Sequence, residues 1–142
     1  MVETSASGPE LNVAILGDPD GPMAVTTVDF GDAGGLGIVT YDCKWTPGTP
    51  DYEARSVSAR GRFDDDLLAR VKQSARDAFV AIGGSAYGRV DLRLDASGQP
   101  AVIDVNPNPD LHPDAGLAIA ARDAGFDYPT LVARILARAG HA

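Results

Sequence analysis

Residues 87–110 read YGRVDLRLDASGQPAVIDVNPNPD, and this stretch decides the fold. Two short runs of alternating apolar and polar residues flank a turn that contains Gly98, which predicts a β-hairpin. Because side chains alternate along a strand, one face should be apolar and should carry Val90, Leu92, Leu94, Ala101, Ile103 and Val105. The opposite face should carry Arg89, Asp91, Arg93, Val102, Asp104 and Asn106.

The register of this hairpin follows from its turn. Pairing of Asp95 with Pro100 across a four-residue loop places Asp91 opposite Asp104, Arg89 opposite Asn106 and Arg93 opposite Val102. Like charges directly opposed on a sheet are destabilising, with Cβ atoms about 4.5–5.5 Å apart. A hard divalent cation would neutralise the two carboxylates, and Asn106 adds a neutral carbonyl oxygen. Since Mg²⁺ usually completes its coordination with waters and substrate phosphates, the hairpin predicts a magnesium–nucleotide site.

A simpler interpretation is that these polar residues face solvent on an edge hairpin, because antiparallel sheets are commonly polar on one face. The segment Asn-Pro-Asn-Pro at 106–109 favours the site instead. Each proline biases the preceding residue towards extended conformations. Asn106 and Asn108 are therefore expected to be held in a stiff segment at the strand end, where a ligand can bind.

The ordered string RVDLRLDASGQPAVIDVNPNPDL, followed by PDAGLAIAARDAGFDYPTLVARIL, resembles the C-terminal lobe of ATP-grasp enzymes of the D-alanine–D-alanine ligase-like branch. The family carries an Arg-x-Asp strand, a turn, and a Glu/Asp-x-Asn strand end. The resemblance covers nearly the whole chain and implies an α+β fold with a mostly antiparallel sheet and helices packed on one face. It also implies that Asp91, Asp104 and Asn106 bind Mg²⁺ (or Mn²⁺). Arg89 would stabilise charge on the transferring phosphoryl group and the tetrahedral intermediate.

The resemblance gives roles to residues nearer the N-terminus as well. Residues 1–10 look like the connector between the two ATP-grasp lobes, with Glu3 near the adenine and Glu10 on the ribose hydroxyls of ATP. Where relatives often carry a lysine after the first acidic residue, this chain has Thr4. Lys44 resembles the phosphate-binding lysine of the loop that closes over the triphosphate, and we expect it to act beside Arg89.

The function implied is that of an ATP-dependent carboxylate–amine ligase acting through an acyl phosphate. Two departures affect its details: Pro-Asn-Pro-Asp at 107–110 replaces the family's Ser-Pro-Gly segment, which makes D-alanine as acceptor doubtful, and Asp104 is one methylene shorter than the usual glutamate. On this interpretation residues 1–142 are one C-terminal lobe, and the substrate domain and first ATP-grasp lobe are absent. A separate N-terminal lobe is then an expected partner. The alternative is a stand-alone or degenerate nucleotide-binding module without turnover.

Composition limits the other classes of function. A chain of 142 residues that is 44% hydrophobic is long enough for one compact domain. Its net charge of −8 argues against general nucleic-acid binding and against attraction to an anionic membrane. The single cysteine, Cys43, allows no intramolecular disulfide, and no apolar run approaches the roughly 18 residues of a membrane span. Because a lone cysteine suits a reducing compartment and no membrane span is predicted, we expect a cytoplasmic protein.

Apolar patterns and turn residues predict the remaining elements. The expected strands are 11–17, 23–30, 38–41 and 55–59. A helix should begin after its N-cap Asp64 and end at Gly83, with further helices at 113–124 and 128–139.

If an unneutralised carboxylate pair exists, Asp91→Asn should leave the fold intact or slightly stabilised.

Overall fold

The computed structural model describes residues 6, 8–17, 21–29 and 55–139. Within these residues the chain forms a five-stranded sheet in the order β3-β2-β1-β4-β5, and every neighbouring pair is antiparallel. The elements are β1 (Glu10–Leu16), β2 (Gly21–Asp29), β3 (Arg55–Ser58), α2 (Asp65–Ala81), β4 (Tyr87–Leu94), β5 (Pro100–Asn106), α3 (Gly116–Asp123) and α4 (Tyr128–Ala139). The expected antiparallel α+β class is confirmed. The strand expected at 38–41 lies outside the described residues.

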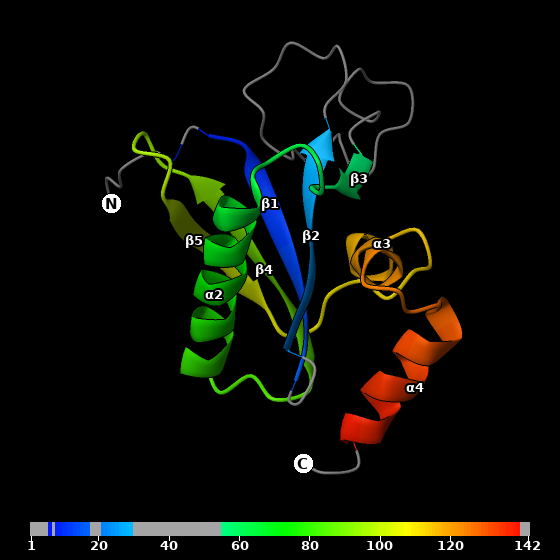
Figure 1. Ribbon diagram of the computed structural model, residues 1–142. Coiled ribbons are helices and arrows are strands. Elements are labelled where there is room, and N and C mark those ends of the chain that lie inside the picture. The colour runs from blue at the N-terminus through cyan, green and yellow to red at the C-terminus, as the bar shows by residue number, and fades with distance from the viewer. Residues whose placement is uncertain (1–5, 7, 18–20, 30–54, 140–142) are drawn as a thin grey trace, which may run out of the picture.

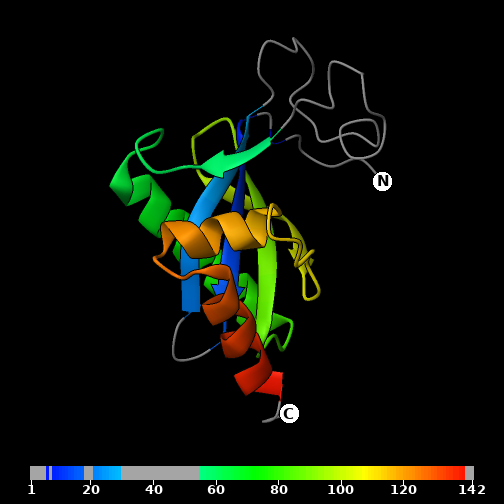
Figure 2. The same cartoon turned by 90° about the vertical axis from the view of Figure 1, so that its right-hand side faces the viewer.

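Helices cover both faces of the sheet, so the expectation that they pack on one face is wrong (Figure 1). Helix α2 packs on one face, while α3 lies across the strands on the other, with α4 beside it (Figure 2). The reason lies in β1, which is buried at every position from Leu11 to Leu16. A central strand with apolar residues on both sides must be covered on both sides.

The core is therefore divided into two layers by the sheet. On the α2 side the buried residues include Leu11, Val13 and Ile15 of β1, Val90 and Leu92 of β4, and Leu67, Val71, Ala75 and Phe79 of the helix. On the other side Ala14 and Leu16 pack with Leu117, Ala118 and Leu131 of α3 and α4. The middle of the sheet is therefore packed on both faces.

The helix boundaries largely follow the expected signals. Asp64 caps α2, because its carboxylate accepts a hydrogen bond of 2.7 Å from the Leu67 N–H. Gly83 follows the helix with a φ of 79°, which glycine adopts readily. Helix α4 has the expected bounds, whereas α3 begins at Gly116 rather than at 113. Among the described helices, none is long and apolar enough to cross a membrane.

The hairpin of β4 and β5 has the expected register at its functional end. Asp91 lies opposite Asp104 and Arg89 lies opposite Asn106, as predicted. On β4, Val90 and Leu92 are fully buried towards α2, so the expected division of that strand into an apolar face and a polar face is confirmed.

The register beyond Asp91 differs, so the predicted pairings of Arg93 with Val102 and of Asp95 with Pro100 are wrong, and Pro100 lies opposite Leu94 instead. Val102 lies opposite Leu92 and Ala101 lies opposite Arg93, because a β-bulge at Ile103 interrupts the ladder. A bulge places two residues of one strand opposite one of the other, so it shifts every later pair by one position. Val102 therefore moves to the face of Leu92, and Ala101 moves to the face of Arg93.

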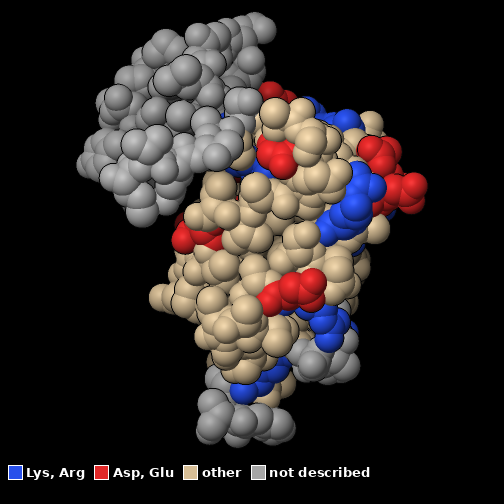
Figure 3. Space-filling view, turned by 90° about the vertical axis from the view of Figure 1, so that its left-hand side faces the viewer, with Lys and Arg blue, Asp and Glu red and all other residues tan. Residues whose placement is uncertain are grey.

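The surface on the side shown in Figure 3 is largely uncharged, with Lys and Arg interspersed among Asp and Glu. Two of the exposed large apolar residues, Val102 and Ile103, belong to the edge strand β5 at the bulge. Bulges interrupt the regular hydrogen-bonding edge that would otherwise pair with another strand.

Candidate functional site

A row of polar residues crosses the whole sheet on the face that carries α3. The row consists of Ser58 on β3, Thr26 on β2, Asn12 on β1, Asp91 on β4 and Asp104 on β5, each directly opposite the next. Residues opposite one another in antiparallel strands project to the same face. The carboxylates of the predicted site are therefore part of a continuous polar row.

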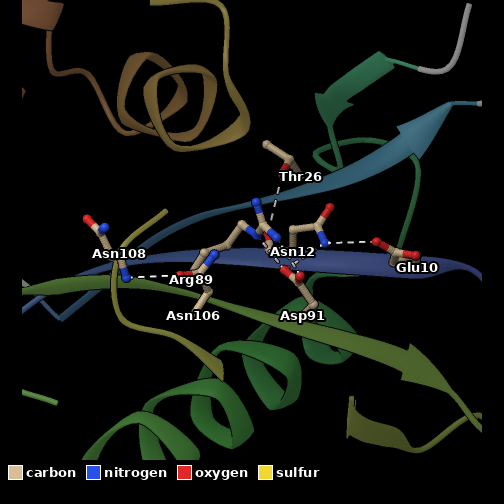
Figure 4. Close-up of polar contacts among 7 residues, drawn as sticks. All are labelled: Glu10, Asn12, Thr26, Arg89, Asp91, Asn106 and Asn108. Carbon is tan, nitrogen blue, oxygen red and sulfur yellow. Dashed lines mark hydrogen bonds and ion pairs between the residues drawn. The ribbon is translucent and has the colours of Figure 1, made fainter. Parts of the chain in front are cut away.

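Arg89 and Asp91 form a two-point ion pair within β4 (Figure 4). Arg89 donates from Nε to Oδ1 of Asp91 at 2.6 Å and from Nη2 to Oδ2 at 2.7 Å. The hydrogen bond to Asp91 is the main cause that raises the pKa of Arg89, and the charges of Asp104 and Glu10 act in the same direction. The guanidinium therefore remains charged.

This ion pair changes the expected behaviour of Asp91→Asn. The sequence prediction assumed that Asp91 and Asp104 face each other without a protein cation. In the structure Arg89 already neutralises Asp91, so its replacement by asparagine breaks a charged pair, and the expected gain in stability has no basis.

Asp104 and Asn106 offer oxygens at the strand end of β5. Asp104 is exposed and makes no hydrogen bond or ion pair within the described part of the chain. The side-chain Oδ1 of Asn106 accepts a hydrogen bond of 2.9 Å from the backbone N–H of Asn108, and it retains a second lone pair. Tyr87 holds the side chain of Asn108, because the Tyr87 hydroxyl donates a hydrogen bond of 2.8 Å to Oδ1 of Asn108.

These residues fit a hard divalent cation. Within residues 6, 8–17, 21–29 and 55–139, no three His, Cys, Asp or Glu side chains gather in a complete metal cage. Two carboxylates and one amide oxygen instead make a partial set of oxygen ligands, which is the kind that Mg²⁺ supplements with waters and phosphates. The direct opposition of Asp91 and Asp104 provides these ligands from adjacent strands.

The structure places Glu10, whose predicted role is ribose binding, on the face of the site and adds Asn12, which sequence reasoning missed. Glu10 is the first residue of β1, opposite Arg93, so it lies on the same face as Asp91. Asn12 lies within the predicted strand 11–17 and had no predicted role, yet its side-chain amide donates to Asp91 and to Glu10 (Figure 4). The sequence does single out Asn12, because it is the one polar residue in the apolar run LNVAILG at 11–17. Glu3 and Lys44 lie outside the described residues.

The comparisons with known proteins agree with this architecture. Residues 1–137 match the family described as "D-ala D-ala ligase C-terminus". The chain belongs to this family. The ATP-grasp fold and the D-alanine–D-alanine ligase-like branch inferred from the sequence are thereby confirmed.

Several D-alanine–D-alanine ligases are similar in sequence to this chain. It is 31% identical over 136 residues to D-alanine–D-alanine ligase of Moorella thermoacetica and 32% identical over 142 residues to D-alanine–D-alanine ligase B of Xanthomonas campestris. Each alignment covers 96% of this chain, but only 41% and 39% of those relatives. The chain thus spans about two fifths of the length of these ligases.

Solved structures show the same fold at lower sequence identity. The D-alanine–D-alanine ligase of Bacillus anthracis complexed with ATP superimposes with a TM-score of 0.70 at 19% identity, over 97% of this chain and 38% of that protein. VanG D-Ala:D-Ser ligase of Enterococcus faecalis gives a TM-score of 0.71 at 20% identity, over 94% of this chain and 36% of that protein. These likenesses concern the fold of the C-terminal domain.

Proposed function

We propose that this chain supplies the metal- and ATP-binding C-terminal half of a carboxylate–amine ligase that works through an acyl phosphate. The observation that carries this proposal is the register of β4 and β5, which sets Asp91 against Asp104 and Arg89 against Asn106 on one face. Membership of the D-ala D-ala ligase C-terminal family supports it. The chain spans about two fifths of the length of these relatives, so the proposed activity includes a further lobe, on the same polypeptide or on a partner.

Asp91, Asp104 and Asn106 are proposed to hold Mg²⁺ or Mn²⁺ against the phosphates of ATP. Bound there, the metal would neutralise phosphate charge during phosphoryl transfer. Asp91 is buried and fixed by Arg89 and Asn12, so its position is set before any ligand arrives. Asp104 is exposed, and within the described part of the chain its carboxylate makes no hydrogen bond or ion pair that a metal would have to displace.

Arg89 is proposed as the catalytic residue that stabilises the transferring phosphoryl group. Transfer of the terminal phosphoryl group of ATP to a carboxylate gives an acyl phosphate and ADP, and attack by an amine then releases phosphate and forms the amide. Negative charge accumulates on oxygen in both steps, and a positioned guanidinium stabilises it. The neighbouring carboxylates keep Arg89 charged, and its side chain is 28% exposed and so accessible to a substrate.

The nucleotide contacts proposed for the rest of the chain follow the family resemblance. Glu10 would accept hydrogen bonds from the ribose hydroxyls, and its place on the face of Asp91 supports this role. Glu3 would lie near the adenine and Lys44 on the phosphates. A second lobe, on the same polypeptide or on a partner, would complete the site and supply the substrate pockets.

Calorimetric titration of the 142-residue chain with ADP, with and without Mg²⁺, tests the proposed site. We expect Mg²⁺ to strengthen ADP binding and Asp91→Asn to remove most of that enhancement, at least about tenfold. Asp66→Asn is the matched control, because it removes an exposed carboxylate from the first turn of α2. Equal Mg²⁺ enhancement in the wild type and Asp91→Asn, or none in a well-folded wild type, would refute the assignment.

A further inference from the structure

Asn12 connects the two carboxylates that the proposed function assigns to different parts of the ligand. Its Nδ2 donates to Oδ1 of Asp91 at 2.9 Å and to Oε1 of Glu10 at 3.3 Å. Asp91 is the proposed metal ligand and Glu10 the proposed ribose ligand. One amide group therefore contacts both carboxylates from the strand between β2 and β4 (Figure 4).

The orientation of this amide is determined by its partners. An asparagine amide has two N–H donors on one side and an acceptor oxygen on the other. Both neighbours, Asp91 and Glu10, are acceptors when ionised, so the opposite orientation would point the amide oxygen at two carboxylates. The two N–H groups thus fix the side chain and the two carboxylates relative to one another.

Asn12 is also unusual for its position in the sheet. The residues on either side of it, Leu11 and Val13, are fully buried, and Asn12 itself is only 6% exposed. An amide buried without hydrogen bonds costs free energy, so a polar residue at this place depends on its partners. The Thr26 hydroxyl contacts the backbone carbonyl of Asn12 at 3.4 Å, which leaves the side-chain amide to the carboxylates.

We propose that Asn12 is a positioning residue that holds Glu10 and Asp91 together, so that metal binding and ribose recognition depend on the same side chain. This inference rests on the proposed function. Groups that hydrogen-bond to a metal ligand orient it, and their loss typically lowers metal affinity by about 10- to 100-fold. Replacement of Asn12 should therefore weaken both metal binding and ribose recognition. Replacement of Asp91 should weaken only metal binding, and replacement of Glu10 only ribose recognition.

Two ratios of dissociation constants, measured by calorimetry on the full chain, separate these properties. The first is the enhancement of ADP binding by Mg²⁺, and the second is the preference for ADP over 2′-deoxy-ADP. Asp91→Asn should reduce the first ratio, and Glu10→Gln should reduce the second. Asn12→Leu should reduce the Mg²⁺ enhancement about tenfold and move the ribose preference to the Glu10→Gln value.

Thr26→Val is the matched control, because it removes a buried hydroxyl next to Asn12 without touching either carboxylate. A purely structural role predicts that both ratios stay at the wild-type values in Asn12→Leu, or that Thr26→Val lowers them equally. Either result would overturn the inference. If circular dichroism shows that Asn12→Leu does not fold, Asn12→Val, which also lacks donors and suits a buried strand, takes its place.

The same measurements separate this inference from the proposed function. If Asp91→Asn and Glu10→Gln lower their respective ratios while Asn12→Leu keeps both, only the role of Asn12 is refuted. If the wild type shows no Mg²⁺-dependent ADP binding, or neither carboxylate variant changes a ratio, the proposed function is refuted and the role of Asn12 with it.

Discussion

Replacement of Arg89 by methionine should destabilise the chain more than replacement of Asp91 by asparagine. The two side chains are unequally buried, with 28% of Arg89 and 9% of Asp91 exposed. Breaking a buried ion pair costs about 3–5 kcal/mol, whereas exposed pairs contribute about 0–1 kcal/mol. Arg89→Met leaves the more buried partner charged beside Asp104, so we expect a loss of about 3 kcal/mol. Asp91→Asn leaves a guanidinium that can turn towards solvent, so we expect about 1–2 kcal/mol.

Urea unfolding followed by circular dichroism in metal-free buffer measures both losses. A loss of about 3 kcal/mol corresponds to a fall in Tm of roughly 10 °C for a domain of this size. Arg70→Met on the exposed side of α2 is the control for removal of a charge alone, and it should change the unfolding free energy by less than about 0.5 kcal/mol. If Asp91→Asn proves the more destabilising, or if Arg89→Met matches Arg70→Met, the ion pair does not hold the site as described.

Three further predictions concern the scaffold and can be checked by the same unfolding measurement. Gly88→Ala should cost about 1–3 kcal/mol, because a Cβ there would lie 2.5 Å from Cε2 of the buried Phe79, and an unchanged unfolding free energy would contradict that packing. Asp64→Ala should cost about 1 kcal/mol through loss of the α2 cap, and a loss no larger than that of Asp66→Ala would exclude capping as its cause. Hydrogen bonds from Thr130 lower the pKa of Asp127 below 3.8, so its stabilising effect is present above that pH and is lost as the pH falls through the lower folded value. Asp127→Asn should therefore flatten the pH dependence of unfolding below about pH 4, and parallel curves for the two proteins would contradict this.

The sequence predicted the hairpin and the pairing of Asp91 with Asp104, and the structure agrees with both. Alternation in 89–94 identified the faces of β4, because side chains alternate along a strand. The turn pairing from which the register was derived is wrong, because Pro100 lies opposite Leu94 rather than Asp95, and the β-bulge at Ile103 restores the predicted pair. The family motif lies in the same local segment, which explains why resemblance and register agree.

The features that sequence reasoning missed depend on contacts between distant segments. The bulge at Ile103 alters pairing without an obvious turn residue, so a simple sum of residue numbers failed beyond Asp91. The contact between Asn12 and Asp91 depends on the pairing of β1 with β4, because Asp91 is 79 residues away in the chain. The continuous apolar run in β1 did contain the signal for helices on both faces, since a strand buried on both sides reads as an unbroken apolar stretch.

The sheet face that carries α3 is divided into an apolar half and a polar half, and this division sets the position of the polar site. Along β1 the residues on this face are Leu16, Ala14, Asn12 and Glu10, so two apolar positions are followed by two polar ones. Leu16 and Ala14 pack under α3 and α4, and the N-terminal residue of α3, Gly116, lies beside Ser56 and Thr26. The apolar half of the face thus packs against α3 and α4, and the polar half begins beside the N-terminal residue of α3. Asp91 is buried there while it accepts hydrogen bonds from Arg89 and Asn12, so a charged group is held in place for binding.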